Sequence, residues 1–334
     1  MSGRNRILIA ALSMLACCIA GCGKSDNAAS TSPTTAPSPS RTYTIAVIPK
    51  GSTHVYWRSV KAGAEAAAAD LGAQIIFKGP VVENDRDSQI DIVEQFASQG
   101  VDAIVLAPLD NVALKPSVDE AMARHIPVVI IDSSLDGDVG KDYVSFCATD
   151  NHRGGEIAGD ELARLLGGKG KVVLLRYDIG SASTIDREAG FLDAMSRNPG
   201  IQLIVKNRYA GPTISSAEDV AMQLADPLQH CDGIFASNES ACSGMLLALR
   251  QLGLAGKVKY VGFDTSAMLL DALKAGEINA LVAQNPRKMA FLGVQQAINA
   301  LHGWPTAPRI DSGAALITAQ NINDPALQEY LEVK

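Results

Sequence analysis

Apolar runs of strand length alternate with helical patterns along most of the chain, beginning at Thr42. In the first half, the runs TYTIAVIP, AQIIF, DAIVLAP and IPVVIID are separated by helical patterns over 55–71, 87–99 and 111–125. Each run is continuously apolar, which is typical of parallel strands covered by helices on both faces. The pattern therefore predicts an α/β fold built on a doubly wound parallel sheet.

The same alternation repeats in the second half, after DYVSFCATDN. The runs there are KVVLLRY, IQLIVKN, DGIFASN, VKYVGFD and INALVAQNP, and helical patterns cover 152–166, 184–197, 215–225, 241–252 and 267–275. Together the two halves hold too many strands for one sheet of ordinary domain size. We therefore predict two similar lobes.

The first residues have the pattern of an export signal. Arg4 and Arg6 precede an uncharged run over 7–21, which is too short for a membrane-spanning helix. The run ends in IAGC, which resembles a bacterial lipobox and implies that 1–21 is removed and that Cys22 becomes the lipidated N-terminus. An ordinary secretory signal cut near Ala20 is the alternative.

The stretch 22–41 is rich in Ser, Thr, Ala and Pro and lacks large apolar residues, so it predicts a disordered tether. A lipid anchor and a tether imply an exported protein held at a membrane, in the periplasm or on the outer face of the cytoplasmic membrane. The net charge of -7, without a basic stripe, disfavours nucleic acid as a partner.

Cofactor and metal motifs are lacking in the sequence. Beyond the signal, Cys147, Cys231 and Cys242 are an odd number without C-x-x-C spacing, so we expect no zinc site and no disulfide framework. A Cys231–Cys242 bridge and buried free thiols both stay open. The stretch GGKGK over 167–171 lacks the spacing of a phosphate loop and predicts a helix-to-strand turn. We therefore expect neither a cofactor nor a metal.

Polar side chains follow the apolar runs at their carboxyl ends, where open parallel sheets bind ligands. These residues are Asp132, Tyr177, Asp178, Asn238, Glu239, Asp264, Gln284 and Asn285. Carboxylates and amides suit sugar hydroxyls, and a flat ring suits the C–H face of a sugar. The stretch GSTHVYWRSV provides Tyr56 and Trp57 beside the first strand, so the pattern favours a sugar site.

Each residue also has a purely structural interpretation. The strand-end residues Asp132, Asn238 and Asp264 can each be a cap or turn residue. Trp57 can pack into an interlobe core, and His54 can be a turn residue. Arg187, near a predicted helix start, can be a solvated surface arginine or a forked donor to hydroxyl or carboxylate oxygens.

Several motifs together resemble a known family. They are VYWRSVKAGAEAAAADLG, VDAIVLAPLD, IPVVIIDS, ATDNHRGGEIAGDEL, IDREAGF, ASNES, VGFD and GEINALVAQNP. From about Thr42 onward the chain looks like the periplasmic sugar-binding proteins of the ribose-binding type (periplasmic binding protein type 1). These are partners of ABC importers and relatives of the effector domain of the LacI repressors. A repressor is excluded, because the lipobox and tether stand where its DNA-binding motif would be.

The resemblance implies two lobes joined by a three-segment hinge, with crossings near 149–150, 284–285 and 311–312. The N-terminal lobe would comprise 42–149 plus 285–311, and the C-terminal lobe 150–284 plus 312–334. Ligand contacts are expected from both lobes. The implied positions are His54, Tyr56, Trp57, Asp132, Ser133, Arg187, Asn238, Phe263, Asp264 and Gln284.

The sequence departs from the ribose type at several of these positions. Ser133 stands where an arginine is expected, and His54 stands where an asparagine is expected. The aromatic residue expected in the second lobe is matched only by Tyr209, and Lys50 adds a charge near the mouth of the cleft that could serve an acidic or differently substituted ligand. We therefore expect another monosaccharide, or a small polyol, rather than ribose.

The resulting functional prediction is a monomeric, non-enzymatic lipoprotein. It would capture a small sugar between its lobes and deliver it to an ABC permease in the membrane. Two alternatives stay open: a ligand-sensing receptor that serves a membrane sensor or chemoreceptor, and an exported enzyme that acts on a sugar.

Overall fold

The structure, a computed structural model, describes residues 41–52 and 54–331. The predicted signal peptide, Cys22 and all but the last residue of the predicted tether lie outside the described residues. The strands are β1 (Tyr43–Ile48), β2 (Ala73–Phe77), β3 (Ala103–Leu106), β4 (Val128–Ile131), β5 (Ser145–Ala148), β6 (Lys169–Arg176), β7 (Gly200–Tyr209), β8 (Gly233–Ala236), β9 (Lys259–Phe263), β10 (Ala280–Gln284), β11 (Arg309–Asp311) and β12 (Ala314–Thr318).

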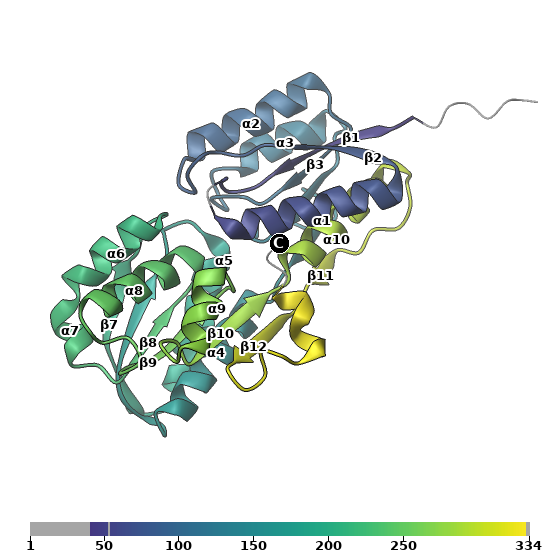
Figure 1. Ribbon diagram of the computed structural model, residues 1–334. Helices are drawn as coiled ribbons and strands as arrows, with labels where there is room; N and C mark the ends of the chain where they lie inside the picture. Colours follow the sequence, from purple (N-terminus) through teal and green to yellow (C-terminus); the bar gives the residue numbers. More distant parts are fainter. Residues whose placement is uncertain (1–40, 53, 332–334) are drawn as a thin grey trace, which may run out of the picture. The chain divides into compact units, whose positions relative to one another are not determined.

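Helices connect most of these strands, as Figure 1 shows. They are α1 (Val55–Leu71), α2 (Arg86–Gln99), α3 (Lys115–Ala123), α4 (Asn151–Leu165), α5 (Ala182–Ser196), α6 (Ile214–Gln223), α7 (Ala225–Gln229), α8 (Glu239–Gln251), α9 (Ala267–Lys274), α10 (Pro286–Leu301) and the 3-10 helix η1 (Pro325–Tyr330).

The strands form two sheets of the same topology. The first has the order β11-β5-β4-β3-β1-β2 and the second the order β12-β10-β9-β8-β6-β7. Neighbouring strands are parallel, except that β12 runs antiparallel to β10. In both lobes the second strand of the chain lies at one edge, next to the first. Equivalent strands therefore deliver their carboxyl ends to equivalent places in the two lobes.

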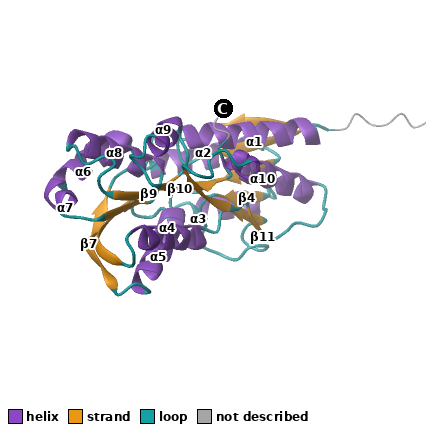
Figure 2. Cartoon of the chain, turned by 60° about the horizontal axis from the view of Figure 1, so that its bottom comes forward, coloured by secondary structure: helices purple, strands orange, loops and turns teal. Residues whose placement is uncertain are grey.

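Helices cover both faces of the sheets (Figure 2). In β1, Ile45 and Val47 belong to the apolar cluster under α1 and α10, whereas Ala46 and Ile48 belong to the cluster under α2 and α3. Successive side chains of a strand point to opposite faces, so burial on both faces requires an uninterrupted apolar run. This accounts for the strand pattern of the sequence.

Within the described residues the chain passes between the two sheets three times: from β5 to α4, from β10 to α10, and from β11 to β12. Two of these segments are bonded to each other. Ser312 N donates to Ala148 O at 3.0 Å, and Asp150 N donates to Asp311 Oδ1 at 3.2 Å. The two lobes are thus joined by adjacent, hydrogen-bonded segments.

The predicted fold class is confirmed. Helix α1 has the predicted bounds, but α3 begins at Lys115 rather than near Asn111. The cause is Asp110, whose Oδ1 accepts from the backbone N–H groups of Val112 and Ala113 and so holds a turn before the helix. The elements α7, α10, β11, β12 and η1 are not among those that the sequence pattern predicts.

Two further expectations concern thiols and membrane spans. Cys147, Cys231 and Cys242 are buried free thiols, so the Cys231–Cys242 bridge is not formed. Over the described part of the chain, no helix is both long and apolar enough to cross a membrane.

Candidate binding site

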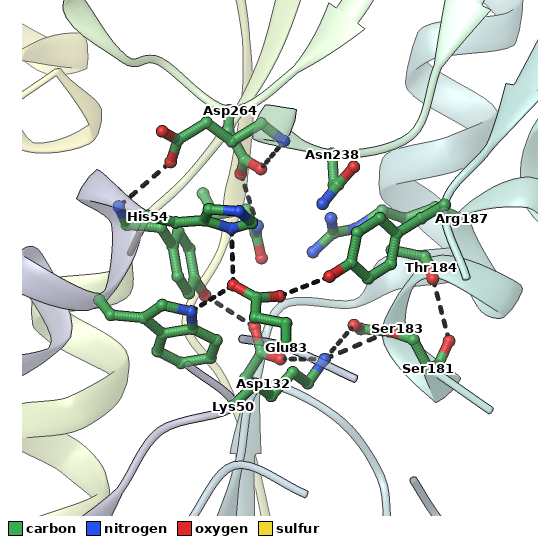
Figure 3. Close-up of a pocket in the computed structure, with 15 residues that line it drawn as sticks. Lys50, His54, Glu83, Asp132, Ser181, Ser183, Thr184, Arg187, Asn238 and Asp264 are labelled. Carbon is green, nitrogen blue, oxygen red and sulfur yellow. Dashed lines mark hydrogen bonds and ion pairs between the residues drawn. The ribbon is translucent and has the colours of Figure 1, made fainter. Parts of the chain in front are cut away.

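A cavity lies where the carboxyl ends of the strands of the two sheets meet, with about 330 Å³ of empty space, part of it open to solvent (Figure 3). Side chains of both lobes line it, and most of them are charged or carry an amide or hydroxyl. The lining residues are Lys50, His54, Tyr56, Trp57, Glu83, Asp132, Tyr177, Ser181, Ser183, Thr184, Arg187, Asn238, Glu239, Asp264 and Gln284.

Asp132 and Asp264 occupy equivalent places in the two lobes, directly after β4 and β9. Both have left-handed backbones, with φ of 65° and 72°. This conformation is uncommon for residues other than glycine, although Asp tolerates it better than most. Local strain of this kind is typical of functional positions. Here it ends each strand at a carboxylate that lines the cavity.

Lys50 is the ion-pair partner of Asp132. Its Nζ lies 2.8 Å from Asp132 Oδ2 and donates to Ser133 Oγ at 2.6 Å. It also donates across the cavity to Ser183 Oγ at 3.0 Å and Ser181 Oγ at 3.3 Å. Since both charged groups are buried, each needs the other to offset its desolvation. Lys50 therefore neutralises Asp132 rather than standing at the mouth of the cleft.

Glu83 accepts hydrogen bonds from three rings. Trp57 Nε1 donates to Glu83 Oε1 at 2.5 Å, and Tyr177 donates its hydroxyl to Glu83 Oε2 at 2.8 Å. His54 Nδ1 lies 2.6 Å from Glu83 Oε1, and its Nε2 lies 3.1 Å from the carbonyl oxygen of Pro212. Figure 3 shows the His54 ring pointing at the Glu83 carboxylate. Glu83 thus fixes aromatic side chains of both lobes.

His54 is held as an imidazolium. Both ring nitrogens face acceptors, Glu83 and the Pro212 carbonyl, so both must carry a proton. Burial disfavours the charged ring, but the nearby Glu83 and Glu239 carboxylates outweigh it and raise the pKa of His54 to about 9. Burial alone would raise the pKa of Glu83; the attraction of His54 and Lys50 instead lowers it.

Arg187 is a buried forked donor, not a solvated surface residue. Its side chain is 2% exposed and lies over the ring of Phe263, with Cζ 4.0 Å from the ring centroid. Nε donates to Asn151 Oδ1 at 2.8 Å, and Nη1 donates to the Ser237 carbonyl at 3.1 Å. These bonds and the cation–π contact hold the guanidinium in one orientation beside Asn238, as Figure 3 shows.

The side of the cavity opposite Asp132 is rich in acceptors. Gln284 Nε2 donates to Asp264 Oδ1 at 2.7 Å, and Glu239 N donates to Asp264 Oδ2 at 2.9 Å. Burial raises the pKa values of Asp264 and Glu239. Gln284 is 3% exposed, and its Oε1 is buried without a hydrogen-bond partner. A buried amide oxygen of this kind requires a donor that the protein does not supply.

Glu239 caps a helix of the other lobe. Helix α1 has no acidic residue in its first turn, and the His54 side chain at its N-cap makes no capping bond. Tyr56 N instead donates to Glu239 Oε2 at 3.2 Å. A carboxylate at this position satisfies an unpaired N–H group and interacts favourably with the helix dipole. The cap therefore exists only while the lobes are together.

The structure brings eight of the ten predicted ligand positions to the cavity wall; Ser133 and Phe263 are not among the residues that line it. Ser133 is fully buried. Its Oγ accepts hydrogen bonds from Lys50 Nζ and from Ser183 N, the latter at 3.1 Å. Phe263 lies beneath Arg187, which covers its ring face.

Some of the residues that line the cavity also have the structural role that the sequence analysis considered for them. Asn238 does cap α8, with Oδ1 accepting from Ala241 N at 3.2 Å, and it also lines the cavity. Asp264 Oδ2 accepts from Glu239 N, the first residue of α8, and so satisfies an N-terminal N–H group of that helix from outside it. Trp57 belongs to the apolar core of the first lobe and also lines the cavity. Tyr209 is 41% exposed and does not line the cavity; the second-lobe ring is Tyr177.

Sequence reasoning missed part of the lining. Glu83 lies in the loop after β2, well beyond the end of that strand at Phe77, so the strand-end rule that selected Asp132 did not select it. The hydroxyl residues at the start of α5, Ser181, Ser183 and Thr184, gave no motif signal. No cluster of His, Cys, Asp and Glu in the described residues could hold a metal ion.

The two-lobed α/β fold, with a polar cavity between the lobes, is that of the periplasmic binding proteins of type 1. Residues 45–304 match the periplasmic binding protein domain, and the chain belongs to that family. The D-ribose/D-allose-binding protein of Pseudomonas aeruginosa is 33% identical over 264 residues, which cover 78% of this chain and 82% of that protein.

Two crystal structures of solute-binding proteins show the same fold. A carbohydrate transporter solute-binding protein from Agrobacterium radiobacter, in complex with D-arabinose, is 34% identical with a TM-score of 0.83, covering 88% of this chain and 100% of that one. An ABC transporter solute-binding protein from Agrobacterium vitis, with bound D-fucose, is 36% identical with a TM-score of 0.83, covering 86% and 99% of the two chains.

Proposed function

We propose that this protein captures a small sugar in the cavity between its lobes and delivers it to an ABC importer. The observation that carries the proposal is the lining of the cavity. Carboxylates, amides and a forked arginine from both lobes surround a space with a buried acceptor, Gln284 Oε1, that lacks a donor. A sugar hydroxyl is a donor of the required kind. The sugars bound by relatives support the same ligand class.

The proposed contacts divide between the lobes. His54, Tyr56, Trp57 and Asp132 would act from the first lobe, and Tyr56 and Trp57 would present ring surface to the apolar side of the sugar. The second-lobe contacts would be Arg187, Asn238, Asp264 and Gln284. Because one ligand touches both lobes, its binding favours the arrangement in which they are together, and that arrangement is what a permease would recognise.

The geometry does not favour catalysis. Asp132 is paired with Lys50, and Asp264 accepts from Gln284 and Glu239 N, so neither is placed as a free nucleophile or base. We therefore propose a binding role without turnover, as a monomer. We also propose the lobe boundaries given above and an anchor at Cys22 that holds the protein outside the cytoplasm.

The test is a titration of the purified protein with a panel of pentoses, hexoses, deoxysugars and polyols, monitored by Trp fluorescence and thermal midpoint. The chain has two tryptophans, and Trp304 is 57% exposed, so a Trp304→Phe variant isolates the Trp57 signal. We expect a saturable response to one or two sugars, and NMR should recover those sugars unchanged. A product in the NMR spectrum, or no response across the panel, would contradict the proposal.

A further inference from the structure

One hydrogen bond between the lobes lies outside the sugar cavity. Arg86, the first residue of α2 in the first lobe, donates from Nη2 to the carbonyl oxygen of Ile179 in the second lobe at 2.6 Å. Neither residue lines the cavity. The Arg86 side chain is 35% exposed and Ile179 is 67% exposed, so the bond lies at the surface of the molecule. It therefore joins the lobes at a place apart from the groups that would bind the sugar.

Asp110 orients the Arg86 guanidinium. Its Oδ2 accepts from Arg86 Nε at 2.8 Å, and its Oδ1 accepts from Val112 N at 3.0 Å and from Ala113 N at 2.9 Å. Burial alone would raise the pKa of Asp110; the hydrogen bonds from Ala113 N and Arg86 instead lower it, so the carboxylate stays charged. All of these groups belong to the first lobe, so the orientation of Arg86 does not depend on the second lobe.

The acceptor belongs to the short loop of the second lobe between β6 and α5. Both ends of this loop are bonded to the first lobe inside the cavity: Tyr177 donates its hydroxyl to Glu83, and Ser181 Oγ accepts from Lys50. Ile179, in the middle of the loop, is bonded to the first lobe outside the cavity. The loop is thus held at three points, and the middle one is separate from the cavity.

Gly180 allows this loop to approach the first lobe. Its φ of 91° lies in the left-handed region that favours glycine. A Cβ atom there would lie 2.5 Å from Asp110 Oδ2 and 3.0 Å from Arg86 Nη2. Asp110 cannot move away without losing its bonds to Val112 N and Ala113 N. A side chain at position 180 would therefore displace the ion pair on which the cross-lobe bond depends.

We propose that Arg86, Asp110, Ile179 and Gly180 form a latch that retains the sugar by holding the lobes together, without contacting the sugar. This inference rests on the proposed function and assigns to it positioning residues that act through closure. Loss of the latch should speed sugar release and leave the association rate unchanged, because the bond forms after the sugar has entered. The factor should be the same for every sugar that binds, since none of them touches the latch.

Stopped-flow fluorescence of the purified protein, with D-ribose, D-allose, D-arabinose and D-fucose as separate probes, measures both rates. Arg86→Ala should raise the dissociation rate of each sugar that binds by about fivefold, because a hydrogen bond from a charged group is lost at a partly exposed position. Ile179→Ala is its control, since this variant removes an exposed side chain and keeps the carbonyl oxygen that accepts from Arg86.

Gly180→Ala should also raise the dissociation rate, because the added methyl group meets the Asp110 carboxylate. Its control is Gly140→Ala, which introduces the same backbone strain without a contact: the φ of Gly140 is 85°, and no atom of the described residues lies within 4 Å of an added Cβ. Both alanine variants should lower the thermal midpoint, but only Gly180→Ala should change sugar release.

A pair of cysteines tests the latch geometry without a ligand. An added Cβ at position 180 lies 3.1 Å from Asp110 Cγ, and a cysteine sulfur at position 110 would lie near that Cγ. This separation suits a disulfide, whose sulfurs are about 2.0 Å apart. Asp110→Cys/Gly180→Cys should therefore form a disulfide in the ligand-free protein, identified by peptide mass mapping. Oxidation with a sugar bound should block its release until the disulfide is reduced.

The inference is overturned if Arg86→Ala and Gly180→Ala release sugar at the wild-type rate, if the factor differs between sugars, or if the control variants change the rate equally. In those cases the proposed function survives. If no sugar binds, the proposed function fails, and the cysteine pair alone decides the latch. A disulfide between positions 110 and 180 supports the latch, and its absence overturns it.

Discussion

At the scale of single residues, the site is a set of buried charges that compensate one another. Lys50 and Asp132 form one pair, and His54 and Glu83 form another, all of them nearly inaccessible to solvent. Removing one member of a buried pair leaves the other uncompensated, which costs more than replacing both. Variants of these pairs can therefore separate the stability of the fold from the affinity of the site.

For the first pair, Asp132→Asn should lower the free energy of unfolding by about 3 kcal/mol, because Lys50 is left buried and unpaired while asparagine tolerates the left-handed backbone. Denaturant unfolding measures this effect. The double variant Lys50→Met/Asp132→Asn should recover part of the stability, yet sugar affinity should stay low because the carboxylate acceptor is missing. Wild-type affinity in either variant would argue against a ligand role for Asp132.

For the second pair, the sign of the pH dependence follows from the raised pKa of His54. Its contribution to stability is fully present below the ordinary value of 6.5 and is lost as the pH rises through about 9. We therefore expect the gap in thermal midpoint between wild type and His54→Gln to shrink as the pH is raised across this window. A gap that is independent of pH would show that His54 is not held as a cation.

At the scale of elements, the carboxyl end of each strand places a side chain at the cavity, and one helix cap joins the lobes. Because α1 receives its cap from Glu239 of the other lobe, this bond is made only when the lobes are together. Caps within a lobe, such as Asp85 on α2, are independent of the cleft. The two kinds of cap should respond differently to mutation.

Glu239→Ala should weaken sugar binding by about fivefold, which corresponds to about 1 kcal/mol for a lost cap, and should speed dissociation in stopped-flow fluorescence. Asp85→Ala is the control: it should lower the thermal midpoint and leave the dissociation rate unchanged. Equal dissociation rates for wild type and Glu239→Ala would contradict a role of the trans-lobe cap in closure.

Features that depend on neighbouring residues could be predicted from the sequence, whereas features that depend on distant partners could not. Strands buried on both faces are continuous apolar runs, and the polar residues at their ends, such as Asp264, can be read directly. Glu83 and Ser181 could not be selected, because their role depends on cross-lobe partners distant in sequence. Nor does the sequence predict that Arg187 packs on the ring of Phe263, since these residues are far apart in the chain.

At the scale of the whole molecule, direct bonds already join the two lobes around the cavity. They run from Lys50 to Ser181 and Ser183, from Tyr177 to Glu83, from Tyr56 N to Glu239, and between His54 and the Pro212 carbonyl. These bonds lower the additional free energy that a ligand must supply to hold the lobes together, since a ligand shifts an equilibrium only by its differential affinity.

Small-angle X-ray scattering should therefore show a decrease in the radius of gyration when the sugar identified by the panel is added. The decrease should be larger for Glu239→Ala than for wild type, because the variant lacks one of the bonds that favour closure in the absence of ligand. A sugar that binds without any change in the radius of gyration in either protein would contradict ligand-linked closure.

The central claim is that a sugar binds between the lobes through buried polar groups such as Arg187. Isothermal titration of wild type and Arg187→Ala with the same sugar tests it most directly. We expect one sugar per wild-type chain with Kd on the order of 1 μM, and binding weaker by about 30-fold in the variant, because hydrogen bonds from a charged group are lost. The same Kd in both proteins would place the sugar elsewhere and contradict the account.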